Sequence, residues 1–365
     1  MANPGWDRLW RIGPPVMSVR DRLRLGLATI LILVGSALLG RFIDGLLIGL
    51  GTYTVLFGAI PSRPHRARVM ASAGIGLIAA VGVGVAVSSS LALTLGAFVL
   101  AAFAGLALDT AMRLGPPGPY FFVLMVGGGT IIGRAGLGVT DVVAPLAAGA
   151  VVAFIAAVLG ADKTGNASPD TSATADTSAS PDTPASPDTP ATQSWARSFR
   201  ERLTWPHPEA VTFARVVVAA TLAFAIPVMA GGTHPFWAVL VAVLVLSYPG
   251  GRRIQVMRAI HRILGTALGF LAYWGWTLIH PPDVVTFAAM DILLWITMGL
   301  AARNYGLACI AITLLALMMT QVLTPDIHPA TLAGDRLLTS IIGAAVVVVV
   351  MIVIQPRRRR AAEDA

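Results

Sequence analysis

Apolar runs recur along the chain and are separated by short polar segments. They are roughly 17–23 residues long, and a helix needs about 20 apolar residues to cross a bilayer. The first six runs lie near 23–40, 43–60, 69–88, 91–109, 119–134 and 140–160. Six more lie near 211–230, 234–249, 258–279, 284–302, 304–323 and 335–355. The pattern predicts an all-α, polytopic membrane protein with about 12 transmembrane helices.

Composition supports this prediction and narrows the chemistry. Hydrophobic residues make up 56% of the 365 residues and charged residues only 12%, a balance that a soluble domain cannot bury. The chain has one cysteine, Cys309, which excludes disulfides and cysteine-based metal sites within one chain. We expect no metal and no cofactor. Arginines precede the first run, and no A-x-A cleavage site follows it, so we expect that run to stay as an anchor.

The basic residues predict sidedness. Alternate connections between the runs, together with the two ends of the chain, hold 22 of the 26 basic residues. Cytoplasmic loops of membrane proteins carry an excess of Arg and Lys. We therefore expect a multi-pass protein of the inner (cytoplasmic) membrane with both termini in the cytoplasm.

The chain divides into two similar halves. A degenerate six-residue Ser-Pro-Asp-Thr repeat, 167–190, lies between them and has no apolar residue larger than alanine or proline to bury, so we expect a disordered tether. An even number of spans per half and a cytoplasmic tether predict two parallel six-helix repeats, related by an axis along the membrane normal. The expected parts are a cytoplasmic interfacial segment at 1–22, the repeats at 23–160 and 210–355, the linker at 161–194, an amphipathic interfacial segment at 195–209 and a basic tail at 356–365.

The stretch SYPGGRRIQVMRAIHRILGTALGF, 247–270, joins a basic cluster to an apolar run. A short turn between two spans offers no surface for a nucleic-acid duplex. Its arginines either set topology and meet lipid phosphates or attract an anion. Helical spacing places Arg258, Arg262, Gly265 with Thr266, and Gly269 on one stripe. Like charges four residues apart repel by about 0.2–0.5 kcal/mol, which favours an anion nearby.

The same region resembles a known family. The segment PFWAVLVAVLVLSYPGGRRIQVMRAIHRILGTALG, 235–269, is similar to the signature of the fusaric-acid-resistance-like (FUSC) membrane proteins, which are relatives of aromatic acid exporters. The resemblance covers the second half, including 303–321, whereas 73–82 in the first half lacks the Arg and the Gly-Thr. It implies export of small organic anions, often aromatic carboxylates. The signature falls on Trp237, Pro249, Arg262, Gly265, Thr266 and Gly269.

These arguments select a set of candidate residues. Arg215 either snorkels to the surface or faces the interior as an anion ligand, and Trp237 either stacks on an aromatic substrate or anchors the chain at the interface. We expect Arg134 and Arg336, near the outer ends of runs, to be interfacial. The candidate substrate-binding residues are Arg215, Trp237, Arg258, Arg262, Gly265, Thr266 and Gly269.

Asp291 lies about a third of the way through an apolar run. Ionisable groups in the hydrocarbon region are costly and are functional candidates. Asp291 either takes up and releases a coupled proton or forms a structural pair with an arginine or another helix.

Together, the sequence predicts a transporter that exports small organic anions, with Asp291 as the candidate for proton coupling. The alternatives are a passive anion channel and a non-transporting membrane subunit of cell-envelope machinery. We do not expect an enzyme, because the sequence contains no H-E-x-x-H, G-x-x-x-x-G-K-[ST] or G-x-S-x-G motif. The expected partners are the anion and membrane lipids, with no nucleic acid. The protein is expected to act as a monomer or a homo-oligomer.

Overall fold

The computed structural model is helical throughout the part of the chain that it describes. That part comprises residues 31–32, 35–36, 38–58, 62–112, 114, 118–159, 204, 207–248, 251–300 and 303–354. The predicted linker 161–194, the basic tail 356–365, the segment 1–22 and most of the segment 195–209 lie outside these residues.

Among the described residues, the first half contributes one short helix with a 3-10 extension and four longer helices. They are α2 (Phe42–Gly51), the 3-10 helix η2 (Thr52–Gly58), α3 (Arg63–Val87), α4 (Leu91–Met112), α5 (Tyr120–Arg134) and α6 (Val139–Leu159). The described part of the second half contributes six helices. They are α8 (Pro208–Met229), α9 (Phe236–Leu246), α10 (Arg252–Ile279), α11 (Asp283–Leu300), α12 (Tyr305–Leu323) and α13 (Pro329–Val353).

Eleven of the twelve predicted runs coincide with a helix, with α2 and η2 together forming one of them. The remaining run, 23–40, lies largely outside the described residues. Six of the described helices, α3, α4, α6, α8, α12 and α13, are long and apolar enough to cross a membrane, and three shorter apolar helices accompany them. The protein is therefore a multi-pass helical membrane protein. The count of twelve spans stays a prediction.

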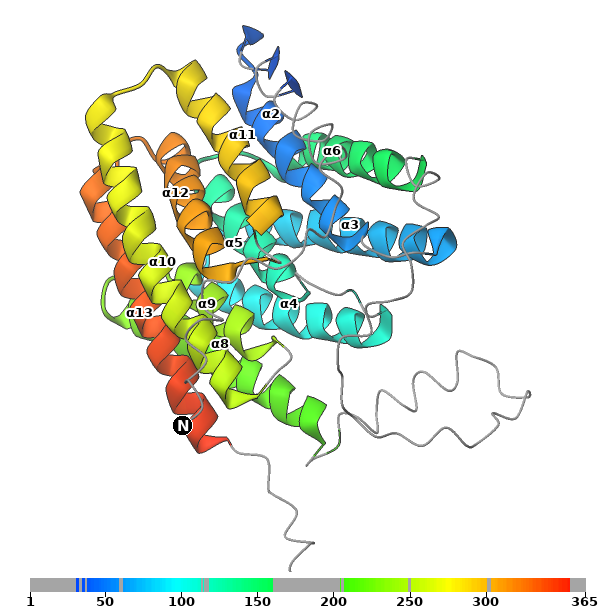
Figure 1. Ribbon diagram of the computed structural model, residues 1–365, viewed down its shortest axis with the longest axis vertical. Helices are drawn as coiled ribbons and strands as arrows, with labels where there is room; N and C mark the ends of the chain where they lie inside the picture. Colours follow the sequence, from blue (N-terminus) through cyan, green and yellow to red (C-terminus); the bar gives the residue numbers. More distant parts are fainter. Residues whose placement is uncertain are drawn as a thin grey trace, which may run out of the picture.

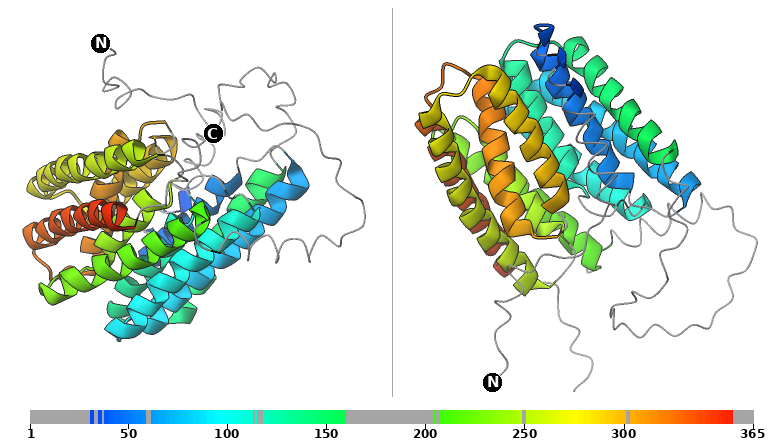
Figure 2. Two further views of the ribbon diagram at one scale, coloured as in Figure 1. Left: turned by 90° about the horizontal axis from the view of Figure 1, so that it is seen from below. Right: turned by 45° about the horizontal axis from the view of Figure 1, so that its top comes forward.

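The helices of the two halves form two groups that lie side by side (Figures 1 and 2). The groups meet mainly where α4 packs on α8 and α5 packs on α9. Aromatic side chains fill this seam: the Phe98 and Phe224 rings are 5.8 Å apart, and the Phe103 and Phe213 rings are 5.1 Å apart. The seam is therefore a packed apolar interface.

Corresponding helices pack in corresponding pairs. In the first half α3 packs on α5 and α6, α2 on α6, and α4 on α5. In the second half α10 packs on α12 and α13, α9 on α13, and α11 on α12. In each half the third predicted span therefore packs on the fifth and sixth, the second on the sixth, and the fourth on the fifth. The two halves thus share a packing pattern, and the two parallel six-helix repeats stay a prediction.

Glycines make the closest of these helix crossings. A Cβ added to Gly84 of α3 would overlap the carbonyl oxygen of Val126 in α5, and one added to Gly129 of α5 would overlap that of Val81 in α3. In the second half, a Cβ on Gly343 of α13 would lie 2.6 Å from the carbonyl oxygen of Ala238 in α9. Small residues allow this approach in a membrane, where packing rather than the hydrophobic effect holds helices together.

Hydrogen bonds define two ends of the molecule. At one end, which we call the basic end, Arg66 donates to the carbonyl of Ala157 (3.0 Å) and Gln255 to that of Leu246 (3.5 Å). At the opposite end, Arg134 donates to the carbonyl of Thr233 (3.3 Å). The arginine-rich starts of α3 and α10 lie at the basic end. Which of the two ends faces the cytoplasm stays a prediction.

Replacing Gly129 with alanine is expected to lower the free energy of unfolding by about 1–3 kcal/mol, because the new methyl group has no room against α3. Gly128→Ala is the matched control. The neighbouring position has open space for a Cβ, and alanine favours the helix by about 1 kcal/mol. Unfolding of both variants in detergent, followed by circular dichroism, checks this. Equal stability of the two variants would contradict the crossing.

Candidate functional site

The predicted stripe on α10 faces the protein interior. Arg262, Gly265, Thr266 and Gly269 are all buried, and Arg258, one turn nearer the basic end, is partly exposed. The helix begins at Arg252, earlier than predicted, because Gly251 has an extended conformation and starts the helix. The basic residues from Arg252 onward are thus helical rather than part of a turn.

The Arg262 side chain is fully buried between α10 and α12. Its exposed fraction is 0%, and its Nη1 lies 4.0 Å from the Cys309 sulfur. The Nε and Nη2 atoms have no hydrogen-bond acceptor in the described part of the chain. These two atoms form one edge of the guanidinium, which is the edge that can bind both oxygens of a carboxylate.

Arg336 is the clearest correction to the sequence predictions. It is not interfacial: its exposed fraction is 2%, and its Nε and Nη1 have no acceptor among the described residues. The cause is the start of α13 at Pro329, before the predicted run, which places Arg336 two turns inside the helix. There its guanidinium lies over the Trp237 ring of α9, with the guanidinium carbon 4.7 Å from the ring centroid.

The two buried guanidinium groups belong to helices in contact, because the Thr266 and Ser340 hydroxyls, each four residues further along its helix, lie 3.4 Å apart. Tyr120, Tyr305 and Cys309 are near both of them. Within the described ranges, no carboxylate lies within 4 Å of either guanidinium. An uncompensated charge in a protein interior is costly, by several kcal/mol for each ion. The pair is therefore an electropositive centre that a bound anion would stabilise.

Hydroxyl groups and glycines set the position of this pair. The Thr266 hydroxyl of α10 lies 3.4 Å from the Ser340 hydroxyl of α13, so the two helices meet between the arginines. A Cβ on Gly265 would overlap Cys309, and a Cβ on Gly269 would lie 2.6 Å from the Thr313 side chain. The candidate glycines thus provide close helix packing against α12.

Arg258 connects the pair to the basic end. Its guanidinium carbon lies 3.7 Å from the Tyr248 ring centroid and 4.0 Å from that of Tyr305. Cation–π contacts stabilise a cation without neutralising it. Arg258, Arg262 and Arg336 therefore form a series that leads from the basic end of α10 to the interior, with Tyr305 beside the first two.

The Trp237 ring is in contact with other side chains of the protein. The His234 ring is stacked on it, with centroids 4.6 Å apart and planes 15° apart. Asp335 holds His234 in place: its Oδ2 accepts from the Thr233 hydroxyl (2.8 Å) and the His234 backbone N–H (3.1 Å), and lies 2.9 Å from His234 Nδ1. Stacking of Trp237 on a substrate stays a prediction.

Two candidates lie apart from the arginine series. Arg215 donates from Nε to the carbonyl of Ile354 at the end of α13 (2.8 Å). It is partly exposed at the basic end and caps that helix.

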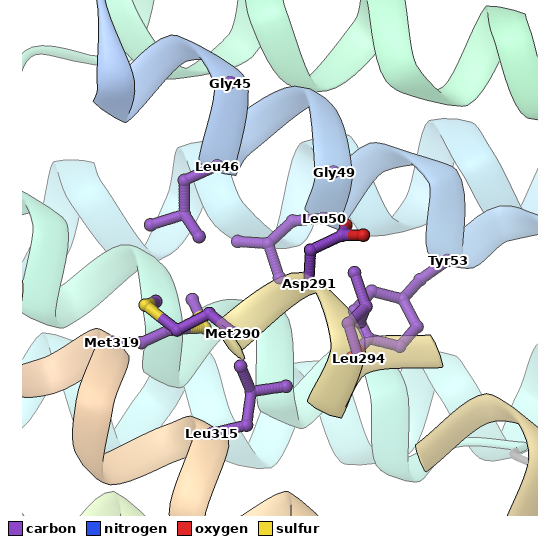
Figure 3. A pocket seen from close by; sticks show the side chains of 10 residues that line it. All are labelled: Gly45, Leu46, Gly49, Leu50, Tyr53, Met290, Asp291, Leu294, Leu315 and Met319. Carbon is purple, nitrogen blue, oxygen red and sulfur yellow. The ribbon is translucent and has the colours of Figure 1, made fainter. Parts of the chain in front are cut away.

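Asp291 of α11 faces α2 in the other half, next to Leu50 and Gly49 (Figure 3). Its exposed fraction is 4%. The pocket beside it encloses about 20 Å³ of free space and is lined by residues of α2, η2, α11 and α12, including Tyr53 and Met319. This space holds about one water molecule and is too small for an organic acid.

The sequence analysis missed Arg336, Tyr120, Tyr305 and Cys309 as parts of one site. Cys309 and Tyr120 lie in apolar runs with no charged neighbour. The only local signal for Arg336 was its place between apolar residues, followed by Thr339 and Ser340.

The helices that carry the buried arginines match a known protein family. Residues 216–350, which include α9 to α12 and most of α8 and α13, match the family model described as "Fusaric acid resistance protein-like". This stretch is similar to that family, and we refer to it below as the fusaric acid resistance protein-like domain. This confirms the resemblance predicted for the second half, and the family points to a role in membrane transport. No curated protein and no solved structure matches the chain.

Asp335→Asn is expected to lower the free energy of unfolding by about 1–3 kcal/mol, because it removes a charged acceptor from three polar contacts at the end of the molecule opposite the basic end. Asp44→Asn is the control. Its carboxylate pairs with the exposed Arg41 (2.6 Å), and surface pairs contribute about 0–1 kcal/mol. Denaturant titration of both variants tests the difference, and a larger loss for Asp44→Asn would refute it.

Proposed function

We propose that the protein is an inner-membrane transporter that exports small organic anions, aromatic carboxylates among them, with its basic end in the cytoplasm. The observation that carries the proposal is Arg262. It is a fully buried cation in the fusaric acid resistance protein-like domain, and one edge of its guanidinium has no acceptor among the described residues. A carboxylate from a substrate supplies both oxygens that this edge requires.

The series of arginines supports entry from the cytoplasm. Partly exposed Arg258 raises the local concentration of anions at the basic end, and Arg262 lies one turn further in. Because Arg262 is fully buried, an anion reaches it only when the helices around it separate. Alternating exposure of a buried site is the behaviour of a carrier, whereas an open anion channel would line a continuous path.

Coupling to protons is the proposed role of Asp291. The pocket beside Asp291 is lined by Tyr53 and has room for about one water molecule. The Phe121 ring lies 5.3 Å from the Tyr53 ring and 5.8 Å from the Tyr120 ring between centroids, and Tyr120 lies near both buried arginines. These tyrosines extend from the first half to the anion site in the second, which gives a physical route by which protonation of Asp291 affects anion binding.

Arg262→Gln is expected to reduce benzoate export from proteoliposomes at least about tenfold, because a charge-assisted contact contributes about 1.5–3 kcal/mol. Arg68→Gln is the control, since Arg68 is exposed at the basic end of α3 and donates only to the nearby carbonyl of Pro64. Flux of radiolabelled benzoate measures the effect. Equal export rates in both variants would contradict the assignment of Arg262 as an anion-binding residue.

Asp291→Asn is expected to abolish accumulation driven by a pH gradient and to spare downhill benzoate flux, because asparagine cannot exchange a proton. Asp283→Asn, an exposed change on the same helix, should keep both activities. Flux measured with and without a gradient checks this. If the benzoate flux of the wild type does not depend on the pH gradient, the result would instead favour a passive channel.

A further inference from the structure

We propose that Arg262 and Arg336 together form a single binding site for an organic anion with two negative charges. This inference rests on the proposed function and assigns it a substrate class. It also gives a ligand-binding role to Arg336, a residue that the sequence places at the membrane interface.

The first argument is charge balance. Arg262 and Arg336 are 0% and 2% exposed, each lies one helical turn from the contact between Thr266 and Ser340, and no described carboxylate lies within 4 Å of either. A monoanion neutralises one guanidinium and leaves the other buried without a counter-ion. A dianion neutralises both guanidinium groups. The free-energy cost of burying the two positive charges is therefore smallest when the ligand has two negative charges.

The second argument is hydrogen bonding. Four guanidinium nitrogens, Nε and Nη2 of Arg262 and Nε and Nη1 of Arg336, are buried and have no acceptor in the described ranges. A carboxylate has two oxygens and about four acceptor positions. Two carboxylates provide enough acceptors for donors that come from two separate helices, α10 and α13.

The third argument is the place of Asp335. This carboxylate precedes Arg336 in the chain, yet it bonds to Thr233 and His234 of the α8–α9 connection. Asp335, the nearest acidic residue in sequence, is therefore not the counter-ion of Arg336. The aromatic groups beside the pair are also engaged, because Trp237 contacts His234 and Arg336, and Tyr305 contacts Arg258. Selection at this site is consequently by charge more than by stacking on a ring.

The test compares acids that differ in charge and in ring. Binding of benzoate, phthalate, butyrate and succinate to the purified full-length protein is measured by calorimetry at pH 8, where all their carboxyl groups are ionised. We expect each dianion to bind at least about tenfold more tightly than the monoanion with the same skeleton. In Arg336→Gln this preference should fall to within about twofold.

Two further variants complete the design. Arg336→Lys keeps the charge and should keep part of the preference for dianions, and Arg68→Gln should keep all of it. Size-exclusion profiles establish that each variant is folded. If Arg336→Gln does not fold, the affinities of Arg336→Lys for mono- and dianions are compared with those of the wild type instead. A preference that persists in Arg336→Gln, or equal affinity for mono- and dianions in the wild type, overturns the two-arginine site and leaves the proposed function standing. Absence of binding for all four acids overturns both.

Discussion

Close contact between helix backbones is the constraint on which the position of the site depends. In a bilayer, helices associate by packing and hydrogen bonding, and small residues permit the approach. Gly265 against Cys309 and Gly269 against Thr313 hold α10 on α12. This crossing places Arg262 beside Cys309 and turns Thr266 toward Ser340 of α13. A larger side chain at Gly265 would push α10 away from α12 and separate Arg262 from its surroundings.

Within this packing, the described groups that surround the arginines do not neutralise them. Tyr248 and Tyr305 enclose Arg258, and Trp237 lies under Arg336. Aromatic faces offset part of the cost of burying a cation and leave its net charge in place. A carboxylate in the same position would form an internal ion pair and compete with any external anion. The binding of Asp335 to His234 keeps the acid next in sequence away from that role.

The sequence predicted the helices well because the length and hydropathy of a membrane span are local properties. It also predicted that Arg262, Gly265 and Thr266 share a face, since a helix repeats every 3.6 residues. It could not predict that Arg336 is buried, because this depends on where α13 begins and on its packing against α9. Tyr305 and Cys309 likewise join the site through the crossing of α12 with α10. A position in an apolar run gives no indication of such a role.

The two halves share a packing pattern and differ in charge. Helix α3 packs on α5 and α6 as α10 packs on α12 and α13, yet α3 has no ionisable side chain between Arg68 and Val87. The first half instead contributes Tyr120 near the arginines and Tyr53 near Asp291. In the proposed transport cycle, the first half would contribute uncharged side chains and the wall of α2 that Asp291 faces. Because the proposed anion site and Asp291 both lie near these tyrosines, movement between the halves would act on charge and on protonation together.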